Sequence, residues 1–139
     1  MRFDKINKVY LIGIGGIGMS ALARFFHAQG NAVAGYDRFA TPLTEALISE
    51  GIEIQFNDDV NQLPLWVKEK SGEVLVLFTP AIPKENLVLN FLRDLGYQVF
   101  KRSEVLGLIT KEAYTIAVAG THGKTTTTSI LAHILKDTG

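Results

Sequence analysis

The sequence predicts an α/β fold with a doubly wound, five-stranded parallel sheet, followed by a strand, a phosphate loop and a helix that begin a second domain. Two observations predict it. Short apolar runs alternate with amphipathic segments along the 139 residues, which is the pattern of repeated strand–helix units. Two of these runs are followed at once by a glycine-rich loop and a helical segment, as at phosphate sites built on a helix start.

The first strand–helix unit occupies the first thirty residues. Lys8–Ile12 (KVYLI) is an apolar run that glycines close, so we expect a strand there. Apolar residues at helical spacing predict a helix over Met19–Gln29, and Gly30 ends it. Asn31–Tyr36 then reads as the second strand.

The next segment begins with a helix over Thr41–Glu50, because Pro42 suits a first helical turn and a glycine follows the segment. Ile52–Phe56 is a short third strand. The stretch Asn57–Ser71 is divided by Pro64, and we expect one or two short helical turns in it.

The five-stranded unit is completed by two further strands and their helices. Glu73–Phe78 is a continuous apolar run, which predicts a central strand with both faces buried. A helix over Lys84–Leu95 leads through a glycine to a fifth strand at Tyr97–Phe100. Ser103–Thr110 is expected to form a short helix with Ser103 as its cap.

A second domain is expected to begin after residue 111. Tyr114–Ala119 reads as a sixth strand, and Thr125–Lys136 as a helix that leaves the second glycine loop. Topology therefore divides the chain into residues 1–111 and residues 112–139.

Composition limits the classes of function. Lys plus Arg and Asp plus Glu are 14 each, so the formal net charge is zero, which argues against a general nucleic-acid-binding protein. The absence of cysteine excludes disulfides and thiolate metal sites. The apolar runs are too short to cross a membrane, and the charged N-terminus lacks a signal peptide's apolar stretch. We expect a cytoplasmic protein with no membrane partner.

The first glycine loop, Gly13–Gly18, matches G-x-G-x-x-G between a strand and a helix, as in Rossmann-like folds. Its glycines let backbone N–H groups approach a diphosphate. Asp37 ends the second strand, where a carboxylate can hold a ribose or a base. The alternatives are a merely structural tight turn, and a carboxylate that is solvated or caps the next segment. The motif does not select the nucleotide, and NAD is the default.

The second glycine loop departs from the full P-loop pattern, because Val118 stands where the first glycine would fall. Lys124 would reach the β- and γ-phosphates of ATP, and the Thr125 hydroxyl would bind Mg²⁺, so these two are the candidate catalytic residues. The alternative is a threonine-capped helix that carries a lysine by chance. The candidate ATP-binding residues are Gly120, Thr121, His122, Gly123, Lys124, Thr125 and Thr126.

Together the two loops resemble the Mur ligases of bacterial peptidoglycan synthesis, most closely the members that add L-alanine. His122 is the most discriminating residue, because other Mur ligases usually have Asn or Ser at that position. The segments that carry the resemblance are Gly13–Met19, Gly35–Asp37, Thr79–Ile82 with Asn86, Arg102–Leu106 and Ala119–Thr128.

The resemblance implies that residues 1–111 bind the UDP part of UDP-N-acetylmuramate, and no NAD is expected. Amides of Gly15–Gly18 would contact the diphosphate, and Asp37 would lie near the uridine. In this family ATP with Mg²⁺ phosphorylates the muramoyl carboxylate, and the amine of L-alanine attacks the acyl phosphate. The UDP-sugar residues implied are Gly13, Gly15, Gly16, Ile17, Gly18, Asp37, Thr79, Pro80, Ala81 and Ile82.

The resemblance also implies that the chain is the N-terminal part of a longer ligase, inactive alone because its P-loop lacks a supporting sheet. Asp58 stands where relatives often carry His, which puts contacts there in doubt. The rival interpretations are a murein tripeptide-recycling Mur ligase, an NAD-binding regulatory or redox module, and a bare structural domain. An uncovered strand at residues 114–119 would pack on the first domain or mediate self-association.

Overall fold

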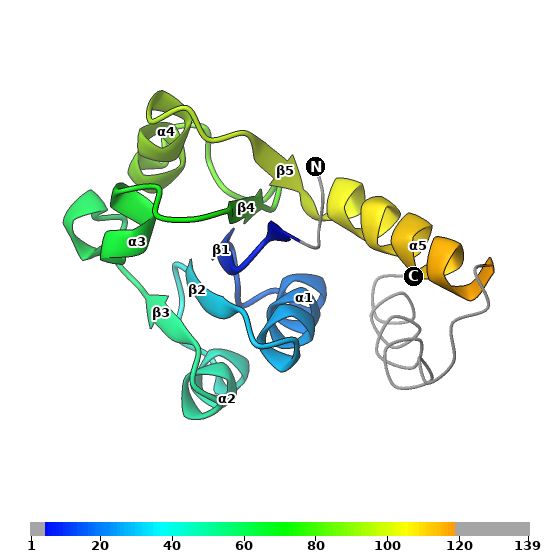
Figure 1. Ribbon diagram of the computed structural model, residues 1–139. Helices are drawn as coiled ribbons and strands as arrows, with labels where there is room; N and C mark the ends of the chain where they lie inside the picture. Colours follow the sequence, from blue (N-terminus) through cyan, green and yellow to red (C-terminus); the bar gives the residue numbers. More distant parts are fainter. Residues whose placement is uncertain (1–4, 119–139) are drawn as a thin grey trace.

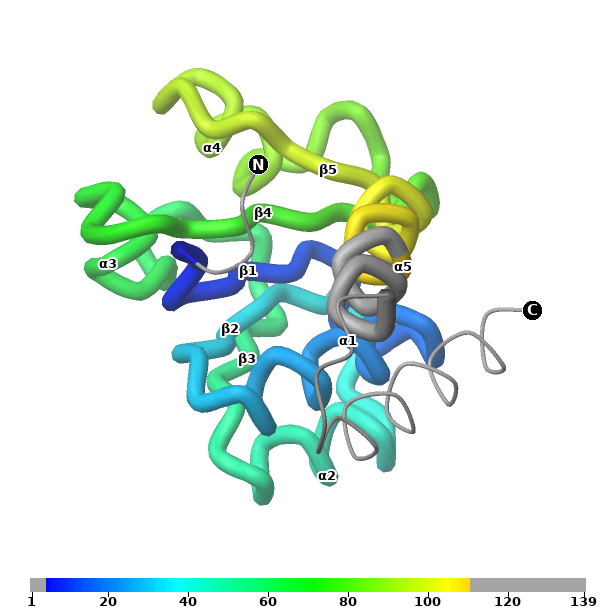
Figure 2. Tube along the Cα trace, turned by 45° about the vertical axis from the view of Figure 1, so that its right-hand side comes forward, coloured from blue at the N-terminus to red at the C-terminus, as the bar shows by residue number. Residues whose placement is uncertain are grey.

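Five parallel strands form one sheet in the computed structural model, which describes residues 5–118 and their side chains as far as residue 110. The strand order is β3-β2-β1-β4-β5, and each neighbouring pair is parallel (Figure 2). This confirms the doubly wound fold. The strands are β1 (Lys8–Ile12), β2 (Ala32–Tyr36), β3 (Glu53–Gln55), β4 (Val74–Phe78) and β5 (Val99–Lys101).

Helices cover both faces of the sheet. Helices α1 and α5 lie on one side, and α3 and α4 lie on the other (Figure 1). The predicted helices and strands before residue 111 are confirmed with ends shifted by at most three residues, except that α5 continues eight residues beyond the predicted end at Thr110. The helices are α1 (Ile17–Ala28), α2 (Pro42–Ser49), α3 (Leu65–Lys68), α4 (Leu87–Asp94) and α5 (Arg102–Val118).

The alternation of side chains along β1 divides the core into two parts. Val9 and Leu11 pack in the cluster that contains residues of α1, α2 and α5. Tyr10 and Ile12 face the opposite way and pack in the cluster that contains residues of α3 and α4. Successive residues of a strand point to opposite faces, so a strand apolar on both faces must be covered twice.

Local signals account for the elements between β2 and β4. Thr41 caps α2 in a reciprocal capping box with Thr44, and Pro42 occupies the first helical position. The ambiguous stretch forms a 3₁₀ turn at Val60–Gln62 and the short helix α3, with Pro64 at the start of α3. The expected helix that begins near Pro42 and the expected short helical turns within Asn57–Ser71 are both confirmed.

The predicted sixth strand is wrong, because α5 continues through Val118 across most of the segment predicted as a strand, Tyr114–Ala119. A helix satisfies its backbone hydrogen bonds internally, whereas an isolated strand needs a neighbour. The proposed self-association relied on that strand and loses its basis. Helix α5 also begins at Arg102, so Ser103 lies inside it; instead the Glu104 carboxylate accepts a hydrogen bond from the Lys101 amide (2.9 Å).

The division into residues 1–111 and 112–139 stays a prediction. The predicted helix Thr125–Lys136 and the glycine loop before it lie outside the described residues. Within the part of the chain that is described, no helix has the length and apolar character of a membrane span.

Candidate functional site

The site lies at the carboxyl ends of β1 and β4, where the strands that follow in the chain lie on opposite sides of the sheet. From β1 the chain passes to β2 on one side, while β4 pairs with β1 on the other, so the carboxyl ends of β1 and β4 form a topological switch point. The Thr79 amide after β4 donates to the Ile12 carbonyl (3.2 Å) at the end of β1. Gly13 has φ of +94°, and a side chain there would collide with Thr79, so glycine is required.

A pocket of about 620 Å³ opens at this switch point, within the size range of small-molecule sites. Loops after β1, β2 and β4 line it, together with the start of α5. Two residues of the predicted UDP-sugar set, Gly15 and Pro80, do not line it. The structure brings the others together around the pocket: Gly13, Gly16, Ile17, Gly18, Asp37, Thr79, Ala81 and Ile82.

The amides at the start of α1 are available to a ligand. The first intrahelical bond runs from the Ser20 amide to the Gly16 carbonyl (2.7 Å). The three preceding amides, Ile17 to Met19, have no acceptor among the described residues, and all three residues line the pocket. They lie at the positive end of a twelve-residue helix, which favours an anion.

The N-terminus of α4 also lies at this pocket, which Asn86 lines, but side chains already accept hydrogen bonds from its backbone amides. Asp58 accepts from the amides of Leu87 (2.8 Å) and Val88 (2.9 Å), and the Asn86 side chain accepts from the Leu89 amide (2.8 Å). The first three amides of α4 are therefore satisfied within the protein. Of these two helix starts, only that of α1 presents free donors.

Asp37 joins two loops of the pocket. Its Oδ2 accepts from the Gly15 amide (2.8 Å), and its Oδ1 accepts from the Phe39 amide (3.0 Å). The amide of Gly15 is thereby occupied, so the free donors of this loop begin at Ile17. Each carboxylate oxygen keeps lone pairs for a further donor, so capping by Asp37 and ligand binding by Asp37 are compatible.

A buried phenol faces the same pocket. Burial raises the pKa of Tyr36, and the negative charges of Asp58 and Asp37 raise it further, whereas Arg38 and a hydrogen bond with the Asn86 side chain lower it. The Tyr36 hydroxyl is therefore protonated at neutral pH and can donate a hydrogen bond to a ligand.

Sequence reasoning did not identify several residues of the pocket. Arg102 follows β5 directly, so its position at the carboxyl end of the sheet was a usable signal. No local pattern reveals that Asp58 caps a helix formed 29 residues later. The lining residues without a predicted role are Met19, Tyr36, Arg38, Phe39, Asp58, Pro83, Glu85, Asn86 and Arg102.

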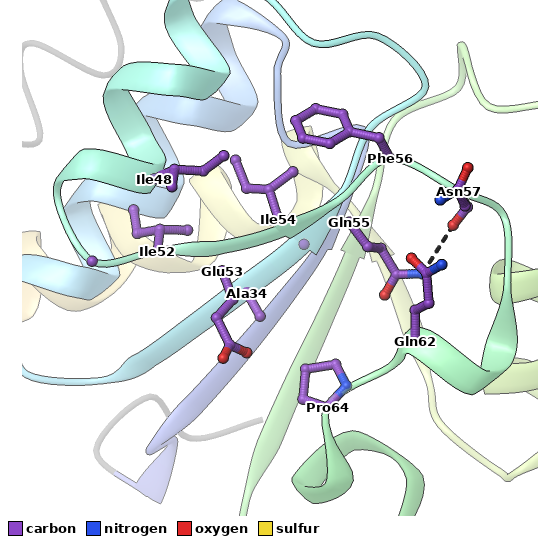
Figure 3. A pocket seen from close by; sticks show the side chains of 12 residues that line it. Ala34, Ile48, Ile52, Glu53, Ile54, Gln55, Phe56, Asn57, Gln62 and Pro64 are labelled. Atoms are coloured by element: carbon purple, nitrogen blue, oxygen red, sulfur yellow. Dashed lines mark hydrogen bonds between the residues drawn. The ribbon is translucent and has the colours of Figure 1, made fainter.

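A second hollow of about 730 Å³ lies along the edge strand β3 and shares no lining residue with the first. Ile54 and Phe56 lie on the side of α2, and Gln62 and Pro64 lie across the strand from them (Figure 3). It has neither a glycine loop nor a free helix start, so we assign it no ligand.

The predicted ATP site lies outside the described residues, which include neither Lys124 nor Thr125 nor the rest of Gly120–Thr126. Among the residues that the structure describes, no group of three or more His, Cys, Asp or Glu side chains is arranged to hold a metal ion.

Known proteins resemble this chain in sequence and structure. It is 52% identical over 136 residues to the UDP-N-acetylmuramate–L-alanine ligase of Christiangramia forsetii, covering 98% of this chain and 30% of that protein. A UDP-N-acetylmuramate-alanine ligase from Thermotoga maritima has a TM-score of 0.61 at 29% identity, covering 93% of this chain and 29% of that one. A murein peptide ligase from Psychrobacter arcticus, with TM-score 0.54 at 24% identity over 66% of this chain and 18% of that one, shares the fold.

The chain spans about 30% of the length of the curated relatives it matches. Its residues 8–114 match the Mur ligase family, catalytic domain. That match covers the whole sheet, the glycine loop after β1 and the pocket at the switch point, and it confirms the resemblance: the chain belongs to the Mur ligase family.

Proposed function

We propose that the pocket at the switch point binds the UDP part of UDP-N-acetylmuramate, and that the chain is the UDP-sugar-binding part of a ligase that adds L-alanine in peptidoglycan synthesis. The observation that carries this proposal is the open start of α1, where three free amides face a pocket of about 620 Å³. The names of relatives at 52% identity support the choice of substrate.

Each part of the pocket suits one part of this ligand. The amides of Ile17 to Met19 would hold the diphosphate at the positive end of α1. Asp37 and the protonated Tyr36 hydroxyl offer an acceptor and a donor for the polar groups of uridine. Thr79 to Ile82 would form the opposite wall.

The remaining chemistry is assigned to residues beyond those described. In the complete ligase, Lys124 and Thr125 would bind ATP and Mg²⁺, the muramoyl carboxylate would be phosphorylated, and the amine of L-alanine would displace phosphate from the acyl phosphate. The division at residue 111 belongs to this proposal. The 139-residue chain alone is expected to bind the UDP-sugar without catalysing ligation.

Parallel titrations of the 139-residue chain test the binding proposal. We expect UDP-N-acetylmuramate and UDP to bind in isothermal titration calorimetry, with NADH giving no heat at the same concentrations. Binding of NADH without a response to either UDP compound would support an NAD-binding module instead. If none of the three binds, the proposed pocket function is wrong and a structural domain remains.

The recycling ligase of the same family also takes UDP-N-acetylmuramate, so this titration does not separate the two. The curated relatives at 52% identity, named alanine ligases, favour alanine as the amino acid joined. A ligation assay on the complete enzyme, comparing L-alanine with murein tripeptide, distinguishes them.

A further inference from the structure

Arg102 has a position in the pocket that its own helix does not explain. It is the first residue of α5, yet its side chain lies over Gly18 at the start of α1. A Cβ atom added at Gly18 would lie 2.9 Å from both Cδ and Cζ of Arg102. Glycine at position 18 therefore makes room for the guanidinium.

We propose that Arg102 binds the phosphate groups of the ligand and that Gly18, which has no side chain, leaves the guanidinium the room it needs there. The inference rests on the proposed function of the pocket and names a residue that decides between nucleotides and nucleosides. It concerns binding alone, because nothing in the described residues gives Arg102 a chemical step.

The charge of Arg102 is unmatched in this structure. Its half-buried guanidinium has no ion-pair or hydrogen-bond partner among the residues described. A cation in the first turn of α5 faces the positive end of that helix, and here it also meets the positive end of α1. Both helix ends and the guanidinium would be stabilised by one anion between them.

Nearby carboxylates do not provide that anion. Asp37 directs its two oxygens to backbone amides of the loops after β1 and β2, and Asp58 directs its two oxygens to the start of α4. Glu104, in the first turn of α5, accepts from the Lys101 amide. Glu85 lines the pocket but forms no ion pair with Arg102 among the residues described.

The chemistry of the group favours phosphate. A guanidinium presents planar, paired donors that match phosphate oxygens, and backbone amides at the start of α1 add further donors to the same anion. Asp37 contacts Gly15 whereas Arg102 contacts Gly18, so the two side chains meet the loop at different points. Uridine would therefore lie toward Asp37, and the diphosphate toward Arg102.

NMR titrations of the 139-residue chain with UDP and with uridine test this inference. We expect Arg102→Met to weaken UDP binding about tenfold or more, because it removes charge-assisted hydrogen bonds, and to leave uridine binding unchanged. Arg102→Lys should retain part of the affinity for UDP as a point charge. Gly18→Ala, which displaces the guanidinium, should resemble Arg102→Met.

Arg24→Met is the matched control, because it also replaces an arginine by methionine, here on α1 and outside the pocket. Arg24 is exposed, pairs with Glu50 (2.8 Å) and does not line the pocket, so its loss should change UDP affinity by less than about twofold. Unchanged UDP affinity in Arg102→Met would overturn the inference, as would an equal loss for UDP and uridine in Arg102→Met and Arg102→Lys. If the unaltered chain binds neither UDP nor uridine, the proposed function itself is overturned.

Discussion

At the scale of single residues, the Asp37 carboxylate links the shape of the pocket to its donors. It accepts a hydrogen bond from the Gly15 amide, which is therefore not available to a ligand. This bond also holds the loop after β1 against the loop after β2. Sequence reasoning placed both Asp37 and Gly15 at this site. It did not establish that they bind each other, because they are 22 residues apart and the contact depends on how β1 and β2 pair.

We predict that Asp37→Ala lowers the free energy of unfolding by about 2 kcal/mol, because two charge-assisted hydrogen bonds are lost, a partly buried one to the Gly15 amide and an exposed one to the Phe39 amide. Urea denaturation measures this. Asp37→Asn keeps one carbonyl acceptor, so its free energy of unfolding should lie between those of the unaltered protein and Asp37→Ala. Asp94→Ala, an exposed residue at the end of α4, should change stability by less than about 0.5 kcal/mol. Equal stabilities of Asp37→Ala and Asp94→Ala would show that the two hydrogen bonds accepted by the Asp37 carboxylate do not stabilise the protein.

At the scale of elements, helix starts decide which parts of the chain can receive a ligand. Helix α2 is capped within four residues by Thr41 and Thr44, whereas the sequence analysis predicted only that the helix begins near Pro42. Helix α4 depends in addition on Asp58, which comes from a loop 29 residues before Leu87. The sequence marked Asp58 only as a departure from relatives. The tertiary structure gives it the role of a helix cap.

We predict that Asp58→Ala destabilises the protein by about 1–2 kcal/mol, because the amides of Leu87 and Val88 lose their acceptors. The side chain of the neighbouring Asp59 accepts one local hydrogen bond, from the Asn61 amide (2.9 Å), so Asp59→Ala should cost less. Thermal unfolding of both variants, followed by circular dichroism, measures the difference. If Asp59→Ala costs as much as Asp58→Ala, the long-range cap is not the cause.

At the scale of the whole molecule, burial of tyrosines links the two-layered core to pH. Burial is the largest cause that raises the pKa of Tyr10, Tyr36 and Tyr97. The Tyr10 hydroxyl donates to Gln55 Oε1 (3.0 Å), which joins the centre of β1 to the edge strand β3. A tyrosine whose pKa is raised by folding stabilises the protein fully below its unfolded pKa, about 10, and loses that contribution as pH rises above it.

We predict that stability falls above about pH 10, and that the contribution of Tyr10 alone steepens toward about 1.4 kcal/mol per pH unit as the pH rises past its unfolded pKa. Tyr10→Phe should cost about 1 kcal/mol at pH 7 through the lost hydrogen bond to Gln55, and should show a shallower decline at alkaline pH. Urea denaturation of both proteins from pH 7 to pH 11 tests this. Parallel declines for the two proteins would contradict it.

The sequence by itself determined the five strand–helix units, the glycine loop between β1 and α1, the start of α2 at Pro42 and membership of the Mur ligase family. These features depend on periodicity, glycine placement and motifs that neighbouring residues carry. Phosphate binding by the loop after β1 stays a prediction. The predicted strand at Tyr114–Ala119 was wrong, because α5 continues through Val118 and local β-propensity does not decide the structure there.

Only the tertiary structure decided which amides remain free for a ligand, which helix start is closed by Asp58, and which cation lies over Gly18. Each of these contacts joins residues from different strand–helix units. Their geometry follows from the order in which the strands pair and from the sterics of the packed loops, so no pattern within one segment could contain it.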